Sequence, residues 1–215
     1  MPKVASLSQE SGAEYGQPVR FGLALHVGEV LYGNIGGAGR LDFTCIGPAV
    51  NLVARLEKVA AQLGREPRAM RAVAHRCPCG LPDVVETAPR LPDGTPFPTL
   101  YYLTCPRAAA AVSKLEAAGL MREMSARLAD DGLRHRYEAA HRDYLARREM
   151  AARAAGVEPL PPGTQSAGGM PERVKCLHAL VAHELVAGVN PFGAEALDAV
   201  GAWWLSGPCI QADTP

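Results

Sequence analysis

Apolar residues near the start of the chain are grouped in short runs, which predict strands, and then in a helical repeat. Residues 21–27 and 41–46 form two apolar runs, so we expect a hairpin of two strands. Five glycines lie between the two runs, from Gly28 to Gly39. Apolar residues at positions 50, 53, 54, 56 and 59 then recur at helical spacing, which predicts a helix that follows Gly47-Pro48 and ends near Gly64 or Pro67.

The pattern changes beyond this helix. Three short strands are predicted at residues 69–75, 83–87 and 99–104, with Pro- and Gly-rich turns between them. A long helical stretch then opens at Pro106, is interrupted near Gly119 and at Asp131-Gly132, and ends around Ala155.

The last part of the chain is expected to be helical after a linker. Residues 156–170 contain three prolines and four glycines, which predicts a loop or linker. Pro171 suits the first position of a helix that reaches Ala187, and Gly188 is its expected stop. A final helix is predicted over residues 194–205.

Charge and hydropathy narrow the classes of partner. The 22 Lys and Arg residues balance 22 Asp and Glu residues, which argues against a general nucleic-acid or acidic-membrane binder. No apolar run approaches the ~20 residues of a membrane helix, and the N-terminus lacks an apolar signal core. We therefore expect a cytoplasmic protein with neither nucleic acid nor membrane as partner. Its six cysteines are then expected to be thiols or metal ligands rather than disulfides.

A glycine series is followed at fixed distance by a more specific motif. The series Gly22-x5-Gly28-x4-Gly33-x2-Gly36 precedes Gly47-x2-Val50-Asn51-x3-Arg55. Asn51 and Arg55 are four apart on the predicted helix, so their side chains leave the same face. An amide beside a guanidinium suits a ribose next to a triphosphate. The alternative is that the Asn caps the helix and the Arg lies on a solvated face.

Residues 20–63 resemble the C-terminal part of the class III adenylate/guanylate cyclase catalytic domain, which has a ferredoxin-like fold. The resemblance implies that Asn51 and Arg55 are catalytic, orienting the ribose and stabilising the transition state, and that Thr44 reads the base. It also implies a nucleoside triphosphate substrate, Mg²⁺ or Mn²⁺, and a homo- or heterodimeric site. The first aspartate of the chain is Asp42, so the metal-binding aspartates of that family are missing here. We expect an inactive remnant of an enzyme, a phosphorus–oxygen lyase, that converts ATP to cyclic AMP in signal transduction.

Residues 61–209 resemble a second family, the bacterial family known as domain of unknown function 501. The resemblance implies no activity. Its motifs are Gln62-Leu-Gly-Arg-Glu-Pro-Arg68, Arg76-Cys-Pro-Cys-Gly80, Pro96-Phe-Pro-Thr-Leu-Tyr-Tyr-Leu-Thr-Cys-Pro106, Ala167-Gly-Gly-Met-Pro-Glu-Arg-Val-Lys-Cys-Leu-His178 and Asn190-Pro-Phe-Gly193.

Thiols and imidazoles are frequent in this second segment. Thiolate and imidazole suit Zn²⁺, and three or more thiolates can hold an iron–sulfur cluster. On a helix from Pro171, Cys176 and His183 share one face, whereas His178 lies nearly opposite and is excluded unless the helix is broken there. The alternative is burial of thiols without any metal. The candidate metal ligands are Cys176, His183, Cys77, Cys79 and Cys105.

These features predict an α+β protein in three parts. Residues 1–19 are expected to form a loose arm, and residues 20–60 a partial ferredoxin-like cyclase segment. Residues 61–215 are expected to hold a small antiparallel sheet with several helices. Two function classes remain: a cyclase remnant, and a metal- or anion-binding module in residues 61–215. An anion would be held where Gly168-Gly169 precedes a helix start with Arg173 and Lys175, although a flexible approach to the helix fits the same residues.

Overall fold

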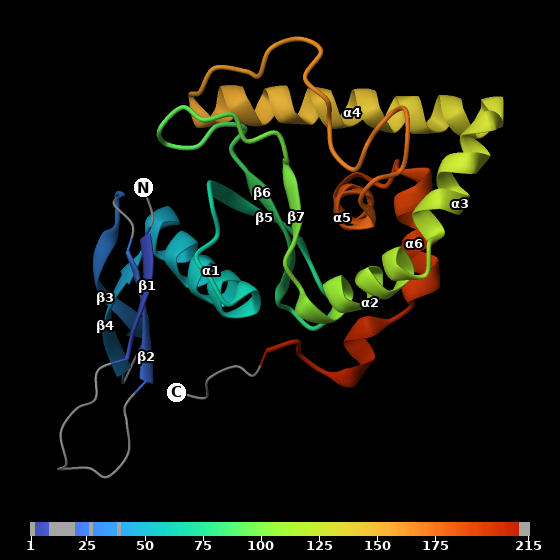
Figure 1. Ribbon diagram of the computed structural model, residues 1–215. Coiled ribbons are helices and arrows are strands. Elements are labelled where there is room, and N and C mark those ends of the chain that lie inside the picture. The colour runs from blue at the N-terminus through green and yellow to red at the C-terminus, as the bar shows by residue number, and fades with distance from the viewer. Residues whose placement is uncertain (1–2, 9–19, 26–27, 38–39, 211–215) are drawn as a thin grey trace. The chain divides into compact units, whose positions relative to one another are not determined.

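The structure is a computed structural model that describes residues 3–8, 20–25, 28–37 and 40–210 (Figure 1). The chain divides into two compact units, Met1–Pro67 and Arg68–Pro215, and each is described by itself. The division falls after residue 67 rather than after residue 60, the boundary expected from the sequence.

In the described part of the first unit, the strands form two separate antiparallel pairs. Strand β1 (Lys3–Ser8) pairs with β2 (Arg20–Leu25), and β3 (Leu31–Gly37) pairs with β4 (Arg40–Ile46). The predicted hairpin of residues 21–27 with 41–46 is therefore wrong: each run pairs with a strand that the sequence pattern did not show.

Strand β3 is not predicted, because its sequence is rich in glycine. Leu31, Tyr32 and Ile35 supply the apolar and aromatic side chains that favour a strand, and they outweigh the glycines among them. Residues 3–8 form β1, so the predicted loose arm is wrong there; residues 9–19, and 26–27 of the predicted strand, lie outside the described residues. The α+β class is confirmed, but the described strands of this unit form two-stranded sheets and show no ferredoxin-like fold.

Helix α1 (Pro48–Leu63) confirms the helix predicted after Gly47-Pro48. Gly47 has a φ of 148°, and Pro48 occupies the first turn, where its missing N–H costs nothing. Gly64 ends the helix in the left-handed conformation, with a φ of 64°.

The second unit contains one antiparallel sheet in the order β5-β6-β7. Its strands are β5 (Met70–Arg76), β6 (Pro82–Thr87) and β7 (Tyr101–Leu103), so the three predicted strands are confirmed, the last one shortened. Figure 1 shows α5 (Leu177–Ala187) beside β7, and this apolar helix contacts all three strands.

Among the other helices of the second unit, α2 (Pro106–Ala117) and α6 (Pro191–Val200) contact α5. Helices α2 and α3 (Leu120–Ala126) are separated at Gly119, which has a φ of 92°. A 3₁₀ turn, η1 (Arg127–Ala129), leads to the long helix α4 (Asp131–Ala155). The carboxylate of Asp130 accepts the N–H of Leu133 and so caps α4. Both predicted interruptions are confirmed.

The final helix begins earlier than predicted. Helix α6 (Pro191–Val200) starts at Asn190, whose side chain accepts the N–H of Gly193, and a 3₁₀ turn, η2 (Trp203–Ser206), follows it. Between α5 and α6, Gly188 provides the predicted stop with a φ of 66°.

The helix predicted from Pro171 begins only at Leu177. The carbonyl of Gly168 accepts the N–H groups of Lys175 and Cys176, at 2.6 and 3.4 Å, and the carbonyl of Gly169 accepts that of Arg173. These bonds close residues 168–176 into a loop, because they satisfy backbone groups that a helix would otherwise use.

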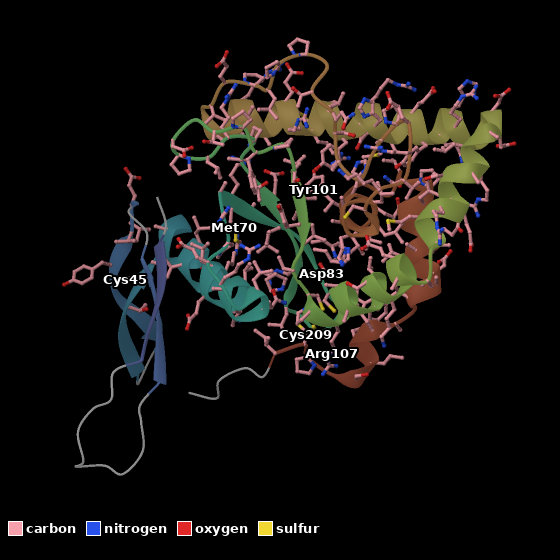
Figure 2. All side chains as sticks on the ribbon, in the orientation of Figure 1. Cys45, Met70, Asp83, Tyr101, Arg107 and Cys209 are labelled. Carbon is pink, nitrogen blue, oxygen red and sulfur yellow. The ribbon has the colours of Figure 1, made fainter. Side chains whose placement is uncertain are left out.

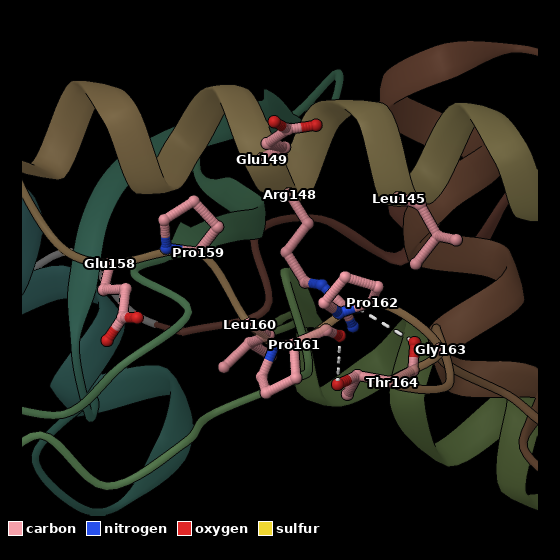
Figure 3. Close-up of a pocket in the computed structure, with 10 residues that line it drawn as sticks. All are labelled: Leu145, Arg148, Glu149, Glu158, Pro159, Leu160, Pro161, Pro162, Gly163 and Thr164. Atoms are coloured by element: carbon pink, nitrogen blue, oxygen red, sulfur yellow. Dashed lines mark hydrogen bonds between the residues drawn. The ribbon is translucent and has the colours of Figure 1, made fainter.

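The predicted linker, residues 156–170, packs into the second unit. Ser166, Ala167 and Met170 are buried. The buried guanidinium of Arg148, on α4, donates hydrogen bonds to the carbonyls of Pro98 and Gln165. It also donates to the carbonyl of Thr164 (Figure 3). The bonds from Arg148 and the burial of these three residues of the segment fix its end, residues 164–170, in the folded core, whereas residues 161–163 are exposed. The largest fully buried side chains of the core are Leu100, Met124, Tyr137, Tyr144, Met170, Leu177, Leu180, His183 and Phe192.

Candidate metal centre

Three chemically different side chains converge between α2 and α5. Glu116 lies in the last turn of α2, Cys176 is the N-cap residue of α5, and His178 lies in the first turn of α5. Their carboxylate, thiol and imidazole ligand atoms all lie within 4.8 Å of one another, and all three residues are half-buried. A single cation can therefore be reached by all three.

Glu116 is held in place by the start of α5. Its Oε1 accepts the backbone N–H of Leu177 at 2.7 Å and lies 3.1 Å from Nδ1 of His178. The free N–H groups at a helix start favour a negative charge, so this glutamate does the capping that the Cys176 side chain does not.

The other ring nitrogen of His178 fixes the orientation of the imidazole. Nε2 lies 3.1 Å from the carbonyl oxygen of Ala109 and 3.3 Å from Oγ of Ser113. Because a carbonyl only accepts, Nε2 carries a proton, and Nδ1 is left facing Glu116. This is the arrangement of a metal-binding histidine, whose second nitrogen donates to a backbone carbonyl.

Without a metal, the three groups form an electrostatic cluster. The hydrogen bond with Cys176 raises the pKa of His178 to about 9, burial opposes the shift, and Glu116 adds to it. An imidazolium between a thiol and a carboxylate accounts for the shift.

The cluster borders a cavity of about 440 Å³, which Cys176 and His178 both line. Lys175, an exposed residue, lines it as well. So do Gly168 and Gly169, which have φ values of 66° and 91°. A Cβ on Gly168 would lie 2.5 Å from Cδ2 of Leu180, so the loop lies directly against α5. The predicted anion loop thus brings Lys175 to the cavity.

The predicted pairing of Cys176 with His183 rests on a wrong premise. Cys176 precedes α5 in an extended conformation, so it does not share a helix face with His183. His183 is fully buried, and its Nε2 lies 3.0 Å from Oδ2 of Asp143. His178, which a helix from Pro171 would exclude, is the histidine that meets Cys176, because α5 begins only at Leu177. Glu116 is not predicted from the sequence, because no pattern links it to residues about 60 positions away.

The other predicted ligands lie in two thiol pairs. Cys77 and Cys79 contact each other in the turn after β5, and the buried Cys105 contacts Cys209. Burial raises the pKa of Cys105 to about 12 and that of Cys77 to about 11, which favours thiols over thiolates. Within the described ranges, neither pair belongs to a group of three His, Cys, Asp or Glu ligands.

The residues predicted from the cyclase resemblance lie in the first unit. Asn51 and Arg55 are both exposed on α1, one turn apart, and Thr44 is half-buried on β4. The backbone N–H of Asn51 donates to the carbonyl of Gly47 in the first helical turn, so Asn51 is not the capping residue.

None of the helices in the described part of the chain is both long enough and apolar enough to span a membrane.

Comparison with protein families finds one family model that matches the chain. The family model described as Protein of unknown function (DUF501) matches residues 73–198, a range that contains all three residues of the cluster. The match does not extend to residues 20–63. No curated protein and no solved structure matches the chain significantly. Because the family model covers more than half of the sequence, the chain belongs to the DUF501 family.

Proposed function

We propose that the second unit is a metal-binding domain that holds Zn²⁺ with Glu116, Cys176 and His178. The observation that carries the proposal is the approach of the three ligand atoms within 4.8 Å while Nε2 of His178 is turned to a backbone carbonyl. Oxygen, nitrogen and sulfur ligands together suit Zn²⁺.

The ligand set separates Zn²⁺ from the other candidates. Mg²⁺ and Ca²⁺ prefer oxygen ligands, and this cluster contributes one thiol and one imidazole. An iron–sulfur cluster needs more thiolates than the one that Cys176 supplies. Zinc is therefore the best match.

Three protein ligands leave one position of a tetrahedral zinc site for another molecule. Cys176 and His178 line the cavity, so that position is expected to face it. A metal with such a position polarises a bound oxygen and lowers the pKa of a bound water. Lys175, on the cavity lining, supplies a positive charge that favours an anionic ligand there.

Zinc binding by the full-length chain tests the proposal. The purified protein is titrated with Zn²⁺ against a chromophoric chelator, and Co²⁺ is added separately to look for a thiolate-to-cobalt absorption band. We expect about one metal per chain, a cobalt band lost in Cys176→Ser, and affinity lost by roughly 100-fold or more in His178→Gln.

Control variants of the same residue types, outside the cluster, distinguish metal ligands from other cysteines and histidines. Cys209→Ser removes a half-buried thiol outside the cluster, and His135→Gln removes an exposed imidazole on α4; both are expected to bind zinc normally. Metal-free protein, or full affinity in both Cys176→Ser and His178→Gln, would show that the cluster is only an internal ion pair.

We propose separately that residues 20–60 are a remnant of a class III nucleotide cyclase that forms no cyclic nucleotide alone. The exposed positions of Asn51 and Arg55, one turn apart on α1, support this proposal. Incubation with ATP and Mg²⁺ or Mn²⁺ tests it. Cyclic AMP formation that Asn51→Ala or Arg55→Ala abolishes would show a working cyclase site instead.

A further inference from the structure

The turn between β5 and β6 carries two cysteines at positions suited to a bond between them. The N–H of Gly80 donates to the carbonyl of Cys77 at 2.8 Å, and the N–H of Cys77 donates to the carbonyl of Leu81 at 3.0 Å. Gly80 has a φ of 84°, which closes the turn. A tight turn of this kind holds residues two apart, here Cys77 and Cys79, within the range of Cα separations that a disulfide bridges.

The two thiols already contact each other and differ in exposure. Their side chains share a hydrogen bond. Cys77 is only 3% exposed, whereas Cys79 is half-buried and open to reagents from solvent. The Cys79 thiol can therefore react with a molecule from solvent, whereas the Cys77 thiol is shielded from solvent next to it.

A buried carboxylate interacts with this pair of cysteines. The Asp83 side chain, on β6, is fully buried, and its charge acts directly on the Cys77 thiol. Its Oδ1 lies 2.7 Å from Nδ1 of His75, but its Oδ2 has no hydrogen-bond partner among the residues that the structure describes. Figure 2 shows Asp83 toward the end of the sheet where α2 begins, and its carbonyl accepts the N–H of Thr104.

An unpaired carboxylate oxygen in a protein interior is costly and calls for a functional explanation. Burial raises the pKa of Asp83, against the opposing hydrogen bond from His75. The poorly solvated oxygen of Asp83 gains from accepting a proton. Burial raises the pKa of the Cys77 thiol to about 11, so this thiol needs a base before its sulfur can attack.

We propose that Cys77 and Cys79 form a redox-active dithiol that exchanges with a low-molecular-weight disulfide, and that Asp83 accepts the proton of Cys77. The Cys79 thiolate attacks one sulfur of R–S–S–R, forming a mixed disulfide and releasing RS⁻. Cys77 then gives its proton to Oδ2 of Asp83, and its sulfur attacks Sγ of Cys79, which releases the second RS⁻. Two electrons pass from the two thiols to R–S–S–R, and the products are a Cys77–Cys79 disulfide and, after protonation, two R–SH molecules.

Glutathione disulfide serves as the probe. The full-length chain in a Cys45→Ser background, which removes an exposed thiol, is equilibrated in glutathione redox buffers, alkylated and analysed by peptide mass spectrometry. We expect a peptide with a Cys77–Cys79 disulfide, reversed by excess reduced glutathione. The Cys105 thiol is the internal reference, and it should be alkylated only after denaturation because Cys105 is fully buried.

Single substitutions separate the two roles. Cys77→Ser should accumulate the glutathione mixed disulfide at Cys79, because no second thiol resolves it, whereas Cys79→Ser should accumulate none at Cys77. Asp83→Asn should slow ring closure by roughly 100-fold, the usual scale of lost general-base catalysis.

The outcomes do not depend on the metal proposal, since Cys176→Ser should leave this chemistry unchanged. Absence of the Cys77–Cys79 disulfide in oxidising buffer would overturn the dithiol assignment. Equal amounts of mixed disulfide in Cys77→Ser and Cys79→Ser would overturn the order of attack. If Asp83→Asn leaves the rate of disulfide closure unchanged, Asp83 is not part of the mechanism. If this variant does not fold, the Cys77→Ser and Cys79→Ser variants still decide the dithiol assignment.

Discussion

Nε2 of His183 lies 3.0 Å from Oδ2 of Asp143, although the two residues are forty positions apart on α5 and α4. The same Oδ2 accepts a hydrogen bond from Arg147 at 2.6 Å. The imidazole also stacks on Tyr101 and meets the edge of Tyr144, with ring centroids 6.2 and 5.2 Å away. His183 is thus a paired histidine of the core, and its partners account for it without a metal.

This burial predicts a pH dependence of stability. Burial lowers the pKa of His183 below its ordinary value, against the opposing bond with Asp143. The unfolded chain therefore binds more protons than the native one once the pH falls below about 6.5, and the free energy of unfolding should fall with it until the folded pKa is passed. His183→Gln keeps a polar partner for Asp143 but cannot titrate, so urea unfolding from pH 7 to pH 5 should show a smaller slope.

Two other histidines complete the comparison. The pKa of His141 is also lowered, by burial and by Arg148 and Arg142, so part of the slope should persist in His183→Gln. His135 is exposed on α4, so His135→Gln controls for a histidine-to-glutamine change outside the core. A slope in His183→Gln equal to that of the parent protein would contradict the assignment to His183.

Two glycine-to-alanine changes should have opposite signs. A Cβ on Gly193, in α6, would overlap the carbonyl oxygen of Leu180 and lie 2.6 Å from Cβ of Glu184, so α5 would have to move away. We expect Gly193→Ala to lower the free energy of unfolding by about 2 kcal/mol or more. Gly132→Ala, in α4, meets only an ordinary contact at 3.4 Å and should raise it by about 0.5–1 kcal/mol. Urea denaturation of both variants checks the signs, and a neutral Gly193→Ala would mean that the helices can separate freely.

Several of the helix ends and strands could be predicted from the sequence, because local residues decide them. Gly119 and Gly188 end helices in the left-handed conformation that glycine favours. The start of α5 is predicted too early, because Pro171 suits a helix and the loop in which the carbonyl of Gly168 accepts the N–H groups of Lys175 and Cys176 has no sequence signature. For the same reason, the sequence does not predict the metal cluster. The contact of Glu116 with His178 depends on how α2 packs against α5, and no spacing along the chain indicates that packing.

Glu116 provides a prediction that separates capping from metal binding. Glu116→Gln retains an oxygen that can accept the N–H of Leu177, so the metal-free protein should lose less than about 1 kcal/mol of stability. Its zinc affinity should fall by roughly tenfold or more, because a neutral amide replaces a charged ligand. Zinc titration and urea denaturation measure the two effects, with Glu123→Gln, an exposed glutamate of α3, as control. Equal zinc affinity in both variants would remove Glu116 from the ligand set.

The division after Pro67 predicts that the second unit folds without the first. All residues of the main hydrophobic cluster belong to the second unit. Its buried members run from Val84 to Ala196. Burial of so many apolar side chains in one cluster is what makes unfolding cooperative. A chain of residues 68–215 should therefore unfold in a single transition, with a urea midpoint close to that of the same transition in the full-length chain. It should also bind zinc like the full-length chain, since Glu116, Cys176 and His178 all lie within it. If residues 68–215 lose cooperative unfolding, then residues 1–67 belong to the same cooperative unit and the boundary is wrong.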